Sequence, residues 1–129
     1  MPLTREKSHH ITVEARLAGR PARFIVDTGA GRTIVDVSAA AEYKLKLQAH
    51  SKKGRGIGSA ATPMSSIAKH DLHLAGVDLS KTKLLAIDLS HLKLTKAKVG
   101  PVVGVIGADV LWRHHALIDY GKSLMLVSE

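Results

Sequence analysis

The chain of 129 residues contains no cysteine. This absence excludes disulfide bonds, thiolate metal sites and cysteine nucleophiles, and it leaves the redox compartment open. Aromatic residues make up only 3% of the sequence, so a core must be built from Val, Ile, Leu and Ala. Because 45% of the residues are hydrophobic, the length predicts a single folded domain over residues 1–129.

Long apolar runs are also absent, since none approaches the roughly 18 residues that span a bilayer. Residues 1–7 are too polar for a secretory signal peptide. The chain as it stands is therefore expected to have no membrane segment and to be cytoplasmic, and an upstream segment would leave a periplasmic or membrane-anchored location open. Lys and Arg outnumber Asp and Glu, which gives a net charge of +8 and favours acidic partners. The charge alone does not distinguish nucleic acid from an anionic surface or an acidic polypeptide.

Alternation of polar and apolar residues predicts a strand over residues 10–17, then a turn and a second, central strand over 22–26. Further strands are expected at 33–35, 65–74, 84–87 and 101–107, with a closing hairpin over 116–127. Short helices are expected at 38–45, capped by Ser38 or Asp36, and at 108–114. Residues 46–53 form a polar, basic stretch that leads into the glycine-containing segment 54–59. The pattern is typical of a mostly β fold with one or two short helices.

Two segments share the order strand, Leu-Ala-Gly turn, apolar strand and aspartate, ending at Asp27 and at Asp88. This echo suggests two similar halves, but only Asp27 is followed by Thr-Gly. Asp27 ends an apolar strand in a tight turn, which has two interpretations. It is either an Asx-turn residue that binds the backbone of Thr28 and Gly29, or a catalytic carboxylate.

Two separated motifs make the second interpretation more specific. The pattern of two apolar residues and Asp-Thr-Gly-Ala at 25–30 is followed, much later in the chain, by Val105-Ile106-Gly107 and a short helix. Together they resemble the retropepsin-like aspartic proteases, and the segment after Gly107 is similar to cellular and bacterial members. The resemblance covers nearly the whole chain and implies a closed, mostly antiparallel, β-barrel-like fold with an active site shared across a homodimer.

The resemblance also assigns roles by position. Asp27 matches the catalytic aspartate, Thr28 the residue that braces the paired loops, and Gly29 a backbone that lies close to substrate. Residues 54–59 correspond to a flap that closes over a bound peptide. The residues expected to contact substrate are Ala30, Gly31, Gly56, Ile57, Gly58 and Ile106. Gly31-Arg32 stands where viral members carry acids, and Arg32 is expected either to pair with Asp109 or to be solvated.

Aspartic peptidases use two carboxylates that share one proton and activate a water molecule. This chain has one Asp-Thr-Gly, so a second Asp27 must come from another copy in an isologous dimer. No metal or organic cofactor is expected. His9-His10 and His114-His115 are not expected to be metal ligands, because adjacent strand residues face opposite sides and no carboxylate cluster matches them.

The sequence therefore predicts a homodimeric aspartic endopeptidase that acts on peptides or proteins. The alternative is a catalytically inactive retropepsin-like dimer that serves as a binding or regulatory module. Nucleic-acid binding is a third hypothesis and is not the expected function, because the lone Trp112 is not a stacking platform. Trp112 is expected in the core or at an interface.

Overall fold

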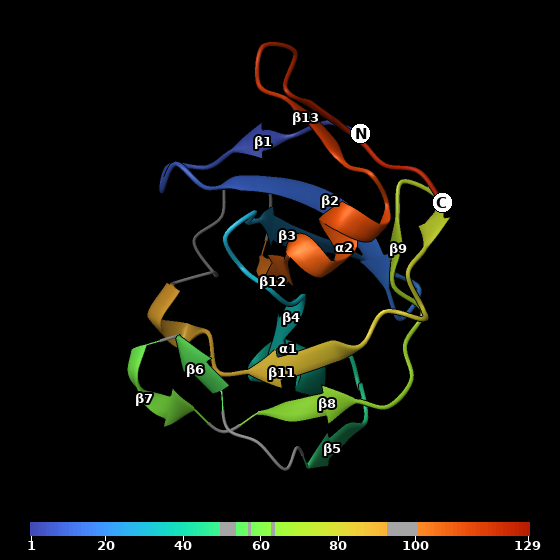
Figure 1. Ribbon diagram of the computed structural model, residues 1–129. Helices are drawn as coiled ribbons and strands as arrows, with labels where there is room; N and C mark the ends of the chain where they lie inside the picture. Colours follow the sequence, from blue (N-terminus) through green and yellow to red (C-terminus); the bar gives the residue numbers. More distant parts are fainter. Residues whose placement is uncertain (50–53, 57, 63, 93–100) are drawn as a thin grey trace.

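The computed structural model describes residues 1–49, 54–56, 58–62, 64–92 and 101–129. Its main feature is a strongly curled sheet with strand order β10-β9-β2-β3-β12-β4-β11-β8-β5 and β1 paired to β2 (Figure 1). The strands of this sheet are β1 (Thr4–Arg5), β2 (Ile11–Leu17), β3 (Arg20–Val26), β4 (Ile34–Asp36), β5 (Leu47–Ala49), β8 (Ser65–Ile67), β9 (His73–Leu74), β10 (Val77–Asp78), β11 (Leu84–Ile87) and β12 (Val102–Ile106). Since this order has two ends, the described strands form a curled half-barrel and not the closed barrel that was expected.

Smaller elements lie around the sheet. Two hairpins are formed by β6 (Gly54–Gly56) with β7 (Gly58–Thr62) and by β13 (Leu117–Asp119) with β14 (Leu124–Leu126). The helices are α1 (Val37–Glu42), α2 (Ala108–Arg113) and the 3₁₀ turn η1 (Ser90–Leu92). The prediction of a mostly β fold with short helices is confirmed. None of the helices in the described part of the chain is long and apolar enough to cross a membrane.

Strand β3 is central, as its apolar sequence predicted. It pairs with β2 in antiparallel and with β12 in parallel orientation, and Phe24 and Ile25 are buried toward opposite faces. All five residues of β12 are buried as well. A side chain at Gly104 of β12 would place its Cβ only 2.2 Å from the carbonyl oxygen of Ile34, so glycine permits β12 and β4 to approach.

The repeated Leu-Ala-Gly segments form two turns of the same kind. Ala18 and Gly19 have φ of 54° and 71°, and Ala75 and Gly76 have φ of 51° and 80°. Each pair connects two antiparallel strands through a two-residue loop, the geometry whose twist suits a hairpin. The sequence repeat is therefore also a repeat of local structure.

The repeat extends to the centre of the sheet. Strand β3 pairs in parallel with β12, which leads into α2, and β11 pairs in parallel with β4, which leads into α1. Because β12 and β4 pair in antiparallel orientation, the two parallel pairs form two similar halves of the sheet. Asp27 and Asp88 occupy equivalent positions in these halves, each directly after one strand of a parallel pair.

Three local features differ in detail from the expectations. Helix α1 begins at Val37 with Asp36 at the N-cap position, one of the two caps that were expected. The Asp36 carboxylate makes no capping hydrogen bond and instead accepts from the Ser38 hydroxyl and the Leu89 amide. The strand expected over 65–74 is divided into β8 and β9, and between them His70 accepts the Leu72 amide at 3.2 Å. Residues 47–49 lie in the polar, basic stretch for which no strand was expected, and they form β5 because they pair with β8.

Candidate active site

Asp27 lies immediately after β3, at the start of an exposed turn. Its amide donates to the carbonyl oxygen of Ile106 at 3.0 Å, which continues the pairing of β3 with β12. Its Oδ1 accepts the Gly29 amide at 2.9 Å, the Asx-turn contact. Within the described part of the chain no donor contacts Oδ2. One carboxylate oxygen is thus fixed by the turn while the other is left available, so the Asx-turn does not exclude a chemical role.

The loop after Asp27 passes directly over the start of α2. The Ala108 amide donates to the carbonyl oxygen of Ala30 at 2.7 Å. A Cβ at Gly107 would lie 2.5 Å from the carbonyl oxygen of Arg32 and 2.8 Å from that of Ala30, distances that no side chain tolerates. Glycine at position 107 therefore allows the loop to thread across the end of β12.

Thr33 and Asp109 close this loop. Thr33 is fully buried, and its hydroxyl donates to Asp109 Oδ1 at 2.7 Å while its amide donates to Oδ2 at 3.1 Å. The same hydroxyl accepts the Gly107 amide at 3.1 Å. Asp109 is thus occupied by Thr33, and no ion pair joins it to Arg32, which is solvent-exposed.

The sequence interpretation did not identify Thr33 as part of the site. The available signal was a hydroxyl residue directly before the buried strand β4, where a polar side chain needs a partner. That signal marks Thr33 as a residue needing a hydrogen bond, but it does not name Asp109 as its partner.

The predicted site residues occupy different environments. Thr28, Gly29 and Gly31 are exposed on the loop, and Ala30 packs in part against the apolar cluster around Ile25. The side chain of Ile106 is fully buried, so this residue presents its backbone to the loop, and its contact with substrate stays a prediction.

The predicted flap coincides with the hairpin of β6 and β7, where Gly56 pairs with Gly58. In the view of Figure 1 this hairpin is drawn at the lower left, to the left of β8 and β11. Ile57 lies outside the described residues. The structure confirms a hairpin here, and the contacts of Gly56 and Gly58 with substrate stay predictions.

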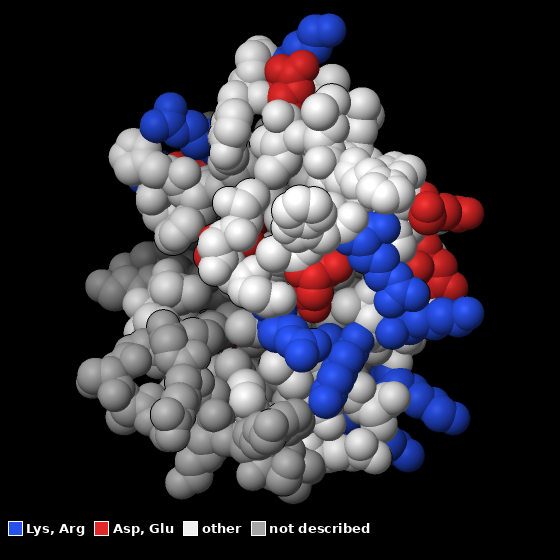
Figure 2. All heavy atoms as spheres, in the orientation of Figure 1, with Lys and Arg blue, Asp and Glu red and all other residues white. Residues whose placement is uncertain are grey.

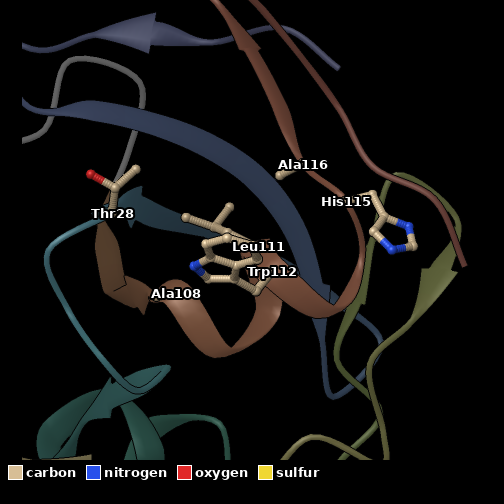
Figure 3. A pocket seen from close by; sticks show the side chains of 6 residues that line it. All are labelled: Thr28, Ala108, Leu111, Trp112, His115 and Ala116. Carbon is tan, nitrogen blue, oxygen red and sulfur yellow. The ribbon is translucent and has the colours of Figure 1, made fainter.

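A depression of about 400 Å³ lies beside the Asp27 loop, and Figure 3 shows the residues around it. Its lining consists of Thr28, Ala108, Leu111, Trp112, His115 and Ala116. The indole of Trp112 lies over α2 between Thr28 and His115, with 82% of the residue exposed. Trp112 is therefore not a core residue of the single chain, and a role at an interface stays a prediction.

Asp88, the counterpart of Asp27 in the second half of the repeat, forms the same type of turn. Its Oδ1 accepts the Ser90 amide at 2.9 Å. This backbone hydrogen bond, followed by one from the Ser90 side chain, lowers the pKa of Asp88 below 3.8. The turn geometry alone therefore does not distinguish the two aspartates; the Thr-Gly sequence and the threaded loop at Asp27 do.

Among the described residues, no group of three or more His, Asp or Glu side chains is arranged to hold a metal ion. His114 is buried, and its Nδ1 lies 2.9 Å from the carbonyl oxygen of Ser128. This contact gives His114 a structural partner at the end of the chain.

The sequence profile of a family described as aspartyl protease matches residues 13–110. The chain belongs to this aspartyl protease family, and its fold is retropepsin-like. The matched range includes the Asp27 turn, β12 and the start of α2. No curated protein sequence matches the chain.

Several solved structures have the same fold as this chain, and three examples come from different sources. The retroviral protease-like domain of Ddi1 from Leishmania major superposes with a TM-score of 0.61 at 18% identity, covering 92% of this chain and 87% of the other. A retropepsin-like aspartic protease from Rickettsia conorii gives 0.61 at 17%, covering 98% and 88%. The EIAV protease in complex with the inhibitor HBY-793 gives 0.57 at 19%, covering 85% and 92%. At these identities the similarity concerns the fold.

Proposed function

We propose that the protein is a homodimeric aspartic endopeptidase in which each copy supplies one Asp27. The observation that carries this proposal is the exposed Asp27 carboxylate, held by the Gly29 amide on a loop that threads over Gly107. Membership of the aspartyl protease family supports the same chemistry.

A second copy is needed because the chain carries a single Asp-Thr-Gly turn, whereas the chemistry uses two such carboxylates. Asp88 is not followed by Thr-Gly, and its Oδ1 accepts the Ser90 amide in a turn of its own. Asp109 is occupied by Thr33, and Asp36 by Ser38 and Leu89. A two-fold axis beside the Asp27 loop would supply the missing carboxylate, because an isologous interface brings the same residue from both copies together.

The chemistry then requires the two carboxylates to share one proton. The ionised carboxylate takes a proton from a water molecule between them, while the water oxygen attacks the peptide carbonyl carbon. The protonated carboxyl gives its proton to the carbonyl oxygen. As this tetrahedral intermediate collapses, the carboxyl that took the water proton gives it to the amine nitrogen and the C–N bond breaks. The other carboxylate takes a proton from a hydroxyl group of the intermediate, which restores the shared proton of the pair. Each step uses groups that the dimer supplies together with water.

The test is Asp27→Asn, assayed with a peptide library derived from a proteome. Because Asp27 is exposed, the variant should fold and dimerise, and cleavage should fall by roughly 10²–10⁴-fold, the usual contribution of acid–base catalysis. Asp88→Asn is the matched control, since it alters the same turn in the other half and should leave cleavage unchanged.

Unchanged cleavage by Asp27→Asn would overturn the peptidase assignment. A wild-type protein that dimerises but cleaves no peptide would also overturn it, and would support the alternative of an inactive dimer that binds other molecules. A wild-type protein that stays monomeric over all concentrations and has no activity would contradict both functions.

A further inference from the structure

Arg32 brings a positive charge into the Asp27 loop. The Ala30 amide donates to the carbonyl oxygen of Asp27 at 3.2 Å, which closes the turn. Arg32 follows two residues later, a step of at most about 7 Å in an extended chain. Its carbonyl oxygen lies over Gly107, so its backbone is fixed where the loop crosses the end of β12, and the residue is exposed. A positive charge is therefore held near Asp27 and open to solvent.

Lys83 lies beside Arg32. In the parallel pairing of β4 with β11, Leu85 stands opposite Ile34. The Leu85 amide also donates to the carbonyl oxygen of Thr33 at 3.3 Å, so the two chains stay adjacent toward their amino ends. Lys83 and Arg32 each precede the pair of Leu85 and Ile34 by two residues. Because neighbouring strands lie about 4.8 Å apart, we expect these two exposed residues to lie side by side.

Arg113 approaches the same place from helix α2. Asp109, which accepts two hydrogen bonds from Thr33, stands in the first turn of α2, and Arg113 follows it by four residues. Residues four apart on a helix are neighbours, with about 5–6 Å between their Cβ atoms. The exposed Arg113 therefore lies on the face of α2 that contacts the end of the Asp27 loop. Arg32, Lys83 and Arg113 together are called the basic cluster.

The positive charge of the basic cluster exceeds the negative charge beside it. Asp109 is the one neighbouring carboxylate that these contacts define, and both of its oxygens accept hydrogen bonds from Thr33. Among the described residues, no ion pair involves Arg32 or Arg113. Figure 2 shows Lys and Arg side chains gathered below and to the right of α2, over β4 and β11. This face is therefore suited to a ligand with negative charge.

The ligand that fits both this charge and the nearby Asp27 is an acidic segment of polypeptide. Under the proposed function, a peptide lies extended across the Asp27 pair and advances about 3.3 Å per residue. A side chain two to four residues from the cleaved bond then lies about 7–13 Å from it. The short loop from Asp27 to Arg32 and the length of the arginine side chain cover this range. The net charge of +8 also attracts acidic segments at long range.

We propose that the basic cluster selects polypeptide substrates that carry Asp or Glu about two to four residues from the cleaved bond. Arg32 binds the acidic side chain, and Lys83 and Arg113 raise the positive potential around it. This inference rests on the proposed function, because a peptide bound at Asp27 brings its acidic side chain to Arg32. In a dimer, the two basic clusters accept acidic residues on both sides of the cleaved bond.

The test starts from a peptide that the wild-type protein cleaves, synthesised with Glu or Gln at each position two to four residues from the cleaved bond. The Glu version should have the higher kcat/KM, by roughly two- to fivefold for one exposed charge pair, and salt should reduce this ratio. Arg32→Gln should bring the ratio close to one. Lys44→Gln is the matched control, because it removes an exposed charge just beyond α1 and should leave the ratio unchanged.

Binding to Asp27→Asn separates recognition from catalysis. Fluorescence anisotropy compares labelled Glu and Gln peptides on this variant and on the double variant that also carries Arg32→Gln. Tighter binding of the Glu peptide that is lost in the double variant supports the proposal. Tighter binding of a single-stranded oligonucleotide than of the Glu peptide, at equal ionic strength, overturns acidic polypeptide as the ligand.

The two functions fail in different ways. Asp27-dependent cleavage with equal kcat/KM for the Glu and Gln versions at every position overturns the role of the basic cluster and leaves the peptidase function intact. Arg32-dependent binding of the Glu peptide, in a protein whose wild type cleaves no peptide, supports recognition of acidic polypeptide by the basic cluster and overturns the peptidase function.

Discussion

Thr33 and Asp109 lie 76 residues apart in the chain and are joined by two hydrogen bonds, of 2.7 and 3.1 Å. They tie the end of the Asp27 loop to the first turn of α2. Thr33 is fully buried. If Asp109 is replaced by a residue with a shorter side chain, the amide and hydroxyl of Thr33 therefore lose these hydrogen bonds and no water can replace them.

We therefore expect Asp109→Ala to lower the free energy of unfolding by about 1–3 kcal/mol, the cost of leaving a buried polar group without a partner. Urea denaturation measures the change. Asp109→Asn keeps the size and one acceptor, so its loss should be smaller. Equal stability of Asp109→Ala and the wild-type protein would contradict a clamping role for this pair.

Gly107→Ala should be strongly destabilising. Its Cβ would lie 2.5 Å from the carbonyl oxygen of Arg32, and the loop would have to move to relieve the contact. Overpacking of this kind costs typically about 1–3 kcal/mol, which thermal unfolding detects. Gly31→Ala is the matched control in the same loop, because a Cβ at this position would meet no atom within 4 Å, and its melting temperature should change little.

Trp112 offers an intrinsic reporter of association, since it is the only tryptophan and is 82% exposed in the single chain. As protein concentration rises, its fluorescence should shift to shorter wavelength when a second copy covers it. An emission maximum that stays constant while sedimentation shows dimer formation would place Trp112 outside the interface.

The turn at Asp88 gives a pH prediction. The pKa of Asp88 is lowered below 3.8, first by the Ser90 amide and then by the Ser90 side chain. A lowered pKa means that the turn contributes stability above the unfolded-state pKa and loses it as pH falls through the folded-state value. In Ser90→Ala the amide remains, so the pKa should rise part of the way toward 3.8.

Carboxyl-carbon NMR of Asp88 as a function of pH measures this shift. Asp78 is the internal control, because its pKa is also lowered, first by the Ser80 amide, and it should titrate identically in both proteins. A full return of Asp88 to its ordinary value in Ser90→Ala would mean that the backbone hydrogen bond contributes nothing.

Local patterns predicted the parts of the fold that depend on neighbouring residues. A few neighbouring residues are enough to determine the alternation in β2, the apolar run of β12 and the Leu-Ala-Gly turns. Within the candidate site, the Asp27 turn was predictable for the same reason, through turn chemistry.

The remaining features depend on partners that are distant in sequence. Thr33 carries no local mark that selects Asp109, and the basic segment at Leu47 becomes a strand because the edge of β8 is there to receive it. His70 interrupts a strand-like pattern because its ring binds the Leu72 amide and the carbonyl oxygen of Thr82. These local structures are determined by tertiary contacts, which cannot be identified from a single sequence.

The presence of one Asp-Thr-Gly turn in each copy has a consequence for how the protein would be controlled. Under the proposed function, a lone copy is inert even when it is correctly folded, because it supplies only one of the two carboxylates. Activity would then rise with the square of the amount present at low abundance. A cell could govern such an enzyme by synthesis, dilution and local crowding, without an inhibitor.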